Sequence, residues 1–371
     1  MLRTVTILIF CITIYSYSSA QEKKEIDESR YKGINTGNET RILESKLNNK
    51  DYKLYISLPK NYDEDINLSY PVLYILDAQW DFTSMVSSQK FLNSDRLIPE
   101  LIVVGISYAG ENPNYSSLRT NDLTPTVIPE RKNSGNAKLF ASVLRTEIIP
   151  FVEREYRASD NRRTLAGNSF GGLFTNYMLF HYTDTFDNYI ICNPSFWYDR
   201  ELSYTFEENY FKDNKKLNAN VILISGSLDD VERHDKMAKQ IESRKYAGLN
   251  FKFSVVEGFA HSSTKSIAYA KGVLHSYKIT PIKLDEKKLL KYTGNYELAP
   301  GKSISITINN GHLAIEEFDG FVNIPIYAVA EGEFSIWGTY IPFDFNKNDD
   351  GDITGLSTEY NDVPITLKKI K

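Results

Sequence analysis

The most informative stretch of the sequence is Thr164-Leu165-Ala166-Gly167-Asn168-Ser169-Phe170-Gly171-Gly172. It starts as a short apolar strand, passes through a Gly-x-Ser-x-Gly turn and leads into residues 172–182, which are predicted to be helical. A serine on such a sharp turn needs glycine on both sides, because a larger side chain would collide with the neighbouring backbone. The pattern therefore predicts Ser169 as an exposed nucleophile, against the alternative of a glycine-rich connection without chemistry. The backbone N–H of Phe170 would stabilise an oxyanion beside it.

Continuous apolar runs of strand length surround this stretch and alternate with segments of helical periodicity. The predicted buried strands are 71–76, 101–107, 163–167, 189–192, 221–225 and 251–256, and the predicted helices include 136–156, 232–244 and 262–275. Such alternation is typical of an α/β protein with a mostly parallel sheet and helices on both faces. Two earlier strands, 41–47 and 52–58, are joined by the turn Asn48–Asp51 and predict an antiparallel start to the sheet.

The pattern changes after Lys278. A charged linker, 281–290, precedes short alternating strands that begin near Tyr292, with turns at Asn309-Asn310-Gly311 and Asp349-Asp350-Gly351. The alternation predicts a small antiparallel β-barrel or sandwich at 291–371, separate from a larger domain at 41–280. Residues 346–351 also resemble the opening of a calcium loop, but Ser357 occupies the place of the bidentate glutamate, so a hairpin turn is predicted.

The first residues have the pattern of an export signal. Arg3 precedes an apolar run from Val5 to Tyr15, and Ser18-Ser19-Ala20 follow it. Residues 1–20 are therefore predicted to be a signal peptide cleaved near Ala20, with 21–40 a polar lead-in, which makes the protein secreted or periplasmic. Cys11 allows a lipoprotein as the alternative, although Phe10 stands where a small residue is required. No membrane span is expected after signal removal.

Composition limits the possible ligands. The formal net charge is −5 without long blocks of one sign, so no nucleic acid partner is expected. Beyond the signal the only cysteine is Cys192, which excludes an internal disulfide and a metal site built on cysteines. No metal and no cofactor is expected, and the oligomeric state is left open.

A serine nucleophile needs a histidine to take its proton and a carboxylate to orient that histidine. In this fold the catalytic residues follow the chain order serine, acid, histidine, with the histidine in a loop after the last strand. Of the five histidines, His261 lies directly after the last predicted buried strand and fits this place. Asp229 and Asp230 follow the strand 221–225, and Asp229 is the preferred acid because Asp230 is suited to capping the next helix. The second oxyanion N–H is predicted from Gln79 or its neighbour Trp80, after the strand 71–76.

Four of these motifs together resemble the putative-esterase family of α/β-hydrolases, which includes enterobactin-type siderophore esterases and is related to esterase D and feruloyl esterases. They are Pro71–Asp77, Gly167–Gly172, Gly226–Asp229 and Glu257–Ser263, within a resemblance that extends over 41–278. The resemblance implies an α/β-hydrolase fold, a serine esterase activity and a small-molecule or polysaccharide-linked ester substrate. Asp229 departs from the glutamate that many siderophore esterases carry.

The resemblance also covers the segment Tyr115–Pro125, which implies Arg119 as a substrate contact near the mouth of the site, with Trp80 beside it. The alternative for Arg119 is a surface ion pair with Asp122. Residues 292–296 and 310–313 are similar to a lipocalin-like accessory domain, which would have no catalytic role.

The sequence thus predicts a secreted carboxylic-ester hydrolase that forms an acyl-serine intermediate and is siderophore-esterase-like. A feruloyl or acetyl esterase acting on polysaccharide is the alternative within enzymes, and a peptidase is less favoured. A non-catalytic binding module with the same fold is the alternative outside enzymes, which the three filled catalytic positions disfavour.

Overall fold

The computed structural model describes residues 39–60, 62–63, 66–318, 320–336, 343–360 and 363–370. The predicted signal peptide and nearly all of the predicted lead-in lie outside these residues.

The first sheet has eight strands in the order β1-β2-β4-β3-β5-β6-β7-β8. Strand β1 pairs with β2 and β2 pairs with β4 in antiparallel fashion, and all pairs from β4 to β8 are parallel. The mostly parallel sheet and its antiparallel start are thus confirmed. Its strands are β1 (Glu39–Glu44), β2 (Asp51–Ser57), β3 (Val72–Ile75), β4 (Ile102–Tyr108), β5 (Thr164–Asn168), β6 (Asn188–Cys192), β7 (Lys216–Gly226) and β8 (Ala247–Val256).

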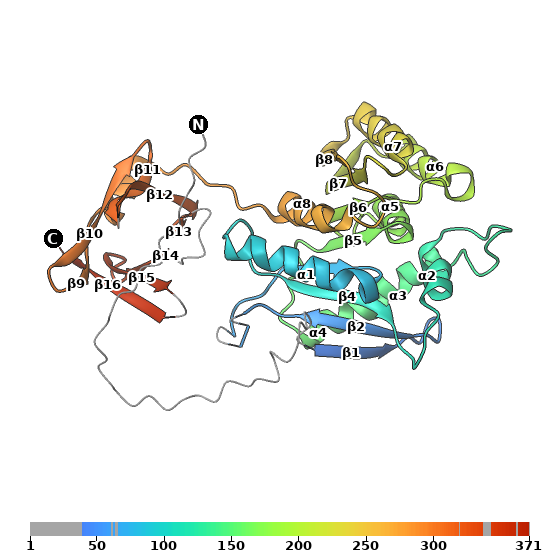
Figure 1. The fold of residues 1–371 in the computed structure, drawn as a ribbon, viewed down its shortest axis with the longest axis horizontal. Coiled ribbons are helices and arrows are strands. Elements are labelled where there is room, and N and C mark those ends of the chain that lie inside the picture. Colours follow the sequence, from blue (N-terminus) through green and yellow to red (C-terminus); the bar gives the residue numbers. More distant parts are fainter. Residues whose placement is uncertain are drawn as a thin grey trace. The chain divides into compact units, whose positions relative to one another are not determined.

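Helices cover both faces of this sheet, as the ribbon in Figure 1 shows. They are α1 (Ala78–Ser94), α2 (Tyr115–Leu123), α3 (Ala137–Val143), the π-helical turn η2 (Leu144–Ile148), α4 (Ile149–Glu155), α5 (Phe170–His181), α6 (Tyr198–Asp213), α7 (Val231–Arg244) and α8 (Lys265–Tyr277). The connector after α8 holds α9 (Glu286–Leu289) and the 3₁₀ turn η3 (Leu290–Tyr292).

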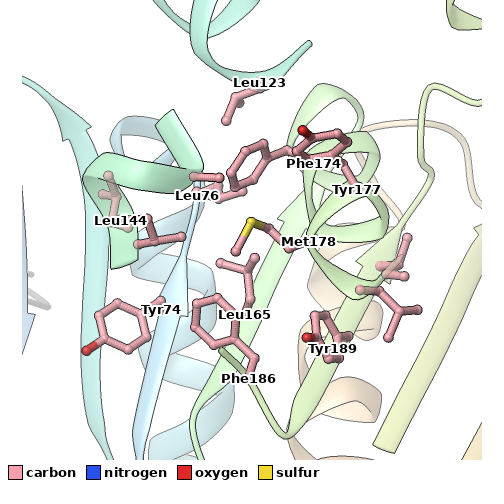
Figure 2. Packing of buried hydrophobic residues seen from close by; sticks show 14 of the residues in the cluster. Tyr74, Leu76, Leu123, Leu144, Leu165, Phe174, Tyr177, Met178, Phe186 and Tyr189 are labelled. Carbon is pink, nitrogen blue, oxygen red and sulfur yellow. The ribbon is translucent and has the colours of Figure 1, made fainter. Parts of the chain in front are cut away.

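The side chains of β3 show why the sheet needs helices on both faces. Tyr74 belongs to one buried cluster, with Phe174 and Met178 of α5, and Figure 2 shows these side chains together. Leu73 belongs to the other cluster, with Phe82 of α1. Since successive residues of a strand point to opposite faces, a strand that is apolar throughout must be covered on both.

The predicted helix at 136–156 is formed by α3, η2 and α4 in succession. Pro150 lies in the first turn of α4 and has no N–H to donate, and the turn before it is the wider π form. The wider turn breaks the simple helical spacing on which the prediction depends. Leu139 of α3, although apolar, is exposed.

The second sheet is antiparallel and has eight strands in the order β13-β12-β11-β10-β9-β16-β15-β14. Its end strands β13 and β14 lie against each other, so the sheet nearly closes into the predicted barrel. The rings of Tyr292, Phe334 and Phe345 meet in its core with centroids 4.6–5.2 Å apart. The strands are β9 (Gly294–Ala299), β10 (Lys302–Asn309), β11 (His312–Phe318), β12 (Phe321–Ala330), β13 (Glu333–Ser335), β14 (Phe343–Lys347), β15 (Ile353–Tyr360) and β16 (Val363–Ile370).

Two hairpin turns of this sheet lie where the sequence predicts them. Asn310 and Gly311 join β10 to β11 with φ values of 51° and 79°, the left-handed pair that a tight hairpin requires. The calcium-like segment 346–351 links β14 to β15 as the predicted hairpin turn.

Candidate active site

Ser169 lies on the sharp turn between β5 and α5, with φ 61° and ψ −118°. Its N–H donates to the carbonyl of Cys192, the buried last residue of β6, over 3.1 Å. A side chain at Gly167 would begin 2.4 Å from the backbone of Gly171, so the predicted need for glycine holds there. The second backbone collision falls at Gly172, 2.8 Å from the Cys192 carbonyl, whereas a Cβ at Gly171 would meet a side-chain oxygen at 3.3 Å.

Two backbone N–H groups near this turn belong to the first turns of helices. Phe170 is the first residue of α5 and Gln79 is the second residue of α1, so neither N–H has an acceptor within its helix. The positive end of each helix dipole favours negative charge there. The side chain of Gln79 is fixed through its Oε1, which accepts from Ser107 Oγ at 2.8 Å.

The structure distinguishes between the two candidate carboxylates. Asp229 Oδ2 lies 2.7 Å from His261 Nδ1. Asp230 is the residue before α7, as predicted, but its carboxylate pairs with Arg233 at 2.9 Å instead of capping the helix. Only Asp229 contacts the candidate histidine.

The contacts of Asp229 keep its carboxyl group ionised. Burial raises the pKa of Asp229, but the hydrogen bonds from His261 and the Asp230 N–H and the attraction to His261 and His234 together lower that pKa below 3.8. A charged acceptor at Nδ1 favours the tautomer of His261 that carries its proton on Nδ1, which leaves Nε2 as a hydrogen-bond acceptor. The imidazole itself is half exposed, with 47% of the His261 side chain accessible.

The hydroxyl of Ser169 has a neighbour that the sequence does not reveal. Ser195 Oγ lies 3.3 Å from Ser169 Oγ, and the Ser195 N–H donates to the Ser169 carbonyl at 3.1 Å. Ser195 is buried and lies three residues beyond β6. No sequence motif marks this serine, since its position depends on β6 lying next to β5 in the sheet.

Arg119 forms a largely buried ion pair with Asp77, which lies on the turn after β3. Its Nε and Nη2 donate to the two carboxylate oxygens of Asp77 at 2.7 and 2.6 Å, and 13% of its side chain is accessible. The alternative pairing with Asp122 is wrong, because Asp122 pairs with Lys50 and accepts from Tyr52 at 2.8 Å. The distance of 42 residues between Arg119 and Asp77 gives no sequence signal for their contact.

The guanidinium of Arg119 also lies 5.1 Å from the Phe170 ring and 5.8 Å from the Trp80 ring. Trp80 is 53% exposed, and Trp197, whose ring is 5.9 Å from Phe170, is 42% exposed. The predicted residues Arg119, Trp80 and Phe170 therefore lie close together beside Ser169. Trp197 is a further aromatic neighbour, which no sequence motif marks.

The other histidines have structural contacts. His234 is buried, with Nδ1 2.7 Å from Ser225 Oγ and Nε2 2.9 Å from the Pro194 carbonyl. The ring of His181 stacks on Tyr177 at 4.2 Å and that of His312 on Tyr327 at 4.8 Å. Burial lowers the pKa of His181, His234 and His275.

Within the described ranges, no three His, Cys, Asp or Glu side chains are grouped to hold a metal ion. In the same part of the chain, no helix has the length and apolarity needed to cross a membrane.

The sheet order and the serine on the turn after β5 define an α/β-hydrolase fold. Residues 45–272 match the Esterase family, described as Putative esterase, and the chain belongs to this family and is an esterase. The match does not extend to the second sheet, so the lipocalin-like resemblance stays a prediction.

Among curated proteins, the chain is similar to the ferri-bacillibactin esterase BesA of Bacillus subtilis, with 28% identity over 262 residues, 64% of this chain and 88% of BesA. Among solved structures, it resembles the BES protein of Bacillus cereus, with 28% identity, a TM-score of 0.59 and coverage of 65% of this chain and 96% of that one. An IroE-like serine hydrolase of Shewanella oneidensis shares the fold, with 24% identity, a TM-score of 0.60 and coverage of 68% and 84%.

Proposed function

We propose that this esterase is a serine carboxylic-ester hydrolase in which Ser169 is the nucleophile, His261 the general base and Asp229 the acid. The observation that carries the proposal is the 2.7 Å contact between Asp229 Oδ2 and His261 Nδ1. Ser169, Asp229 and His261 follow β5, β7 and β8, which are parallel neighbours through β6. Their side chains therefore lie at the carboxyl ends of these parallel strands.

In the proposed reaction, Ser169 Oγ attacks the ester carbonyl while His261 Nε2 takes the hydroxyl proton. The backbone N–H groups of Phe170 and Gln79 stabilise the negative oxygen of the tetrahedral intermediate. His261 then gives the proton to the leaving alcohol, and an acyl-Ser169 ester is left. Water, deprotonated by His261, attacks this ester and releases the acid, which restores the serine hydroxyl.

The resting contact of Ser169 is with Ser195, so His261 would replace Ser195 as the partner of the hydroxyl when substrate binds. Hydrogen bonds of catalytic groups are often long or misaligned before substrate arrives and tighten in the complex. The half-exposed imidazole of His261 has room for such an adjustment.

For the substrate, we propose a siderophore-type ester, on the basis of the similarity to BesA over most of its length. The aromatic surroundings support an aryl-bearing acyl group, since Trp80 and Trp197 offer exposed rings on the Phe170 side of the serine. Arg119 would contribute a cation at the same place, with part of its hydrogen-bonding capacity already used by Asp77.

A panel of p-nitrophenyl, feruloyl, acetyl-xylan and ferri-siderophore esters tests the substrate, with a Ser169→Ala protein as the blank. Preferential turnover of the siderophore esters supports the proposal. Preferential turnover of feruloyl or acetyl-xylan esters would replace it with the polysaccharide alternative. A fluorophosphonate probe tests the mechanism, because it labels only an activated serine, and peptide mass spectrometry should place the adduct on Ser169.

We also propose that the protein is exported and cleaved near Ala20. The support is the charge, apolar run and small residues of 1–20. The purified mature chain should begin at Gln21 by N-terminal sequencing. It should also contain one titratable thiol after denaturation, because Cys11 would be removed and Cys192 retained. Two thiols would contradict cleavage.

A further inference from the structure

Asn193 is the first residue after β6, and its surroundings connect the loops that carry the acid and the histidine. It is buried, with 1% of its surface exposed, and its backbone has a φ of 37°. Asparagine is one of the few residues besides glycine that adopt this left-handed region readily. The backbone N–H of Asn193 donates to the carbonyl of Ile224 in β7 at 2.8 Å.

The carboxamide of Asn193 makes two hydrogen bonds in opposite directions. Its Oδ1 accepts from the N–H of Gly226 at 2.8 Å, at the end of β7 and three residues before Asp229. Its Nδ2 donates to the backbone carbonyl of His261 at 2.9 Å. One side chain therefore links the acid loop to the backbone of the histidine.

The histidine loop has reason to need this link. The pairing of β7 with β8 ends at Gly226 and Val256, so His261 lies beyond the last rung of the sheet. Its side chain is 47% accessible, and packing therefore contributes little to holding the ring. Two other links, from the Leu228 N–H to the Phe259 carbonyl at 3.0 Å and from the Gly258 N–H to Ser227 Oγ at 2.9 Å, lie earlier in the loop and do not reach His261.

We propose that Asn193 is a positioning residue, which holds the backbone of His261 so that its imidazole meets Asp229 and reaches Ser169. The inference rests on the proposed Ser-His-Asp mechanism and adds to it a residue that touches none of the reacting atoms. A displacement of about 1 Å in a catalytic group costs on the order of 10²-fold in rate. A single buried carboxamide that controls the His261 backbone can therefore control kcat.

The test uses the full chain with Asn193→Asp and Asn193→Gly. Aspartate has the same shape and keeps an acceptor for Gly226, but it sets a carboxylate oxygen against the His261 carbonyl. Glycine removes the carboxamide and accepts the positive φ without strain. The matched controls are Asn188→Asp and Asn188→Gly, since Asn188 begins the same strand, is equally buried at 1%, and accepts from Asn220 at 2.9 Å.

The expected result is a fall in kcat of about 10²-fold in both Asn193 variants, with KM within threefold of the parent. Both Asn188 variants should keep kcat within threefold when folded. Proton NMR gives an independent readout: the downfield signal of the His261 Nδ1–H bonded to Asp229 should broaden or disappear in Asn193→Gly and persist in Asn188→Gly. The melting temperature of each variant identifies any protein that fails to fold, and the second substitution at that position then serves.

Wild-type kcat and an unchanged downfield signal in a folded Asn193→Gly protein would overturn the inference. Equal losses of kcat in folded Asn188 and Asn193 variants would also overturn it, because they would indicate a general effect of damaging β6. Failure of the proposed mechanism is distinguishable, since a Ser169→Ala protein would then remain active whatever the Asn193 variants do.

Discussion

Arg119 and Asp77 form a bidentate ion pair, with Nε–Oδ1 and Nη2–Oδ2 distances of 2.7 and 2.6 Å. Asp77 has a φ of 55° at the point where the chain leaves β3 for α1, two residues before Gln79. The pair therefore fixes the turn that carries the proposed second oxyanion donor. Because Asp77 is buried, loss of the guanidinium would leave its carboxylate without a counter-ion.

We predict that Arg119→Met lowers the free energy of unfolding by about 3–5 kcal/mol, the usual cost of leaving a buried charge unpaired. Urea denaturation measures this change. Arg145→Met is the matched control, because Arg145 pairs with the exposed Asp184 and its loss should cost about 1 kcal/mol or less. Equal effects of the two substitutions would contradict a structural role for the Asp77 pair.

Replacing Ser169 with alanine should lower kcat by about 10⁴-fold or more, because the acyl-enzyme route is lost while binding and the oxyanion donors stay. Initial rates on a p-nitrophenyl ester measure the loss. The melting temperature should hold or rise, since alanine keeps the small volume that the turn allows. A variant that keeps a tenth of the activity would eliminate Ser169 as the nucleophile.

Asp229→Asn should reduce kcat by about 10⁴-fold, because an amide in place of the carboxylate favours the wrong tautomer of His261 and does not stabilise its protonated form. Asp230→Asn should change kcat by only a few-fold, since Asp230 pairs with Arg233. The two variants differ by one position and carry the same chemical change. If Asp230→Asn proved the more damaging, the acid would have to be reassigned.

Burial lowers the pKa of His234 below its ordinary value of 6.5, so the unfolded chain binds a proton at a higher pH than the native one. The contribution of neutral, buried His234 to the free energy of unfolding is therefore fully present above pH 6.5. It is lost as the pH falls from 6.5 toward the pKa of His234 in the folded protein. In His234→Gln, the slope of unfolding free energy against pH in this window should decrease by up to about 1.4 kcal/mol per unit. The decrease should be partial, because His181 and His275 shift in the same direction. An unchanged slope would show that His234 titrates normally in the fold.

We expect the C-terminal barrel to be dispensable for chemistry, since the proposed triad and both oxyanion donors precede Lys278. The Ile279 N–H bonds to Leu97 and the Ile282 N–H bonds to Ala328 of β12, so a chain ending at Thr280 divides the connector between these contacts. Its kcat on a small p-nitrophenyl ester should stay within a few-fold of the full chain. A soluble, folded, inactive product would mean that the barrel helps to build the active site.

The sequence predicts well where one local pattern determines the structure. The turn at Ser169 depends on glycines within three residues of it, and buried strands such as β3 need only a continuous apolar run. Helix α2 is missed because its nine residues bury only Thr120, Asp122 and Leu123, which leaves no apolar stripe to detect. Helix α6 is missed because its first turn contains the left-handed residues 199–201 and its sequence is rich in charge.

Contacts between distant segments are the part that the sequence does not reveal. Asp229 and His261 could be chosen from the sequence because the fold class fixes the order of such residues along the chain. Their contact is expected once both have been chosen. The partners of Arg119, Ser195 and Asn193 depend on which strands are neighbours in the sheet. They also depend on the rotamers that these side chains adopt where several loops pack together at the ends of the strands. For Arg119, the nearby candidate Asp122 is paired with Lys50 instead.

Cys192, buried at the end of β6 with its carbonyl bonded to Ser169, is the only cysteine in the part of the chain that the structure describes. Burial raises the pKa of its thiol, which keeps the sulfur in the unreactive protonated form. The part of the folded chain that the structure describes thus offers no thiolate to oxidants and no disulfide to reductants. Folding of this part of the chain therefore requires no disulfide formation, and we expect a reducing host cell and an oxidising extracellular medium to yield the same fold for it.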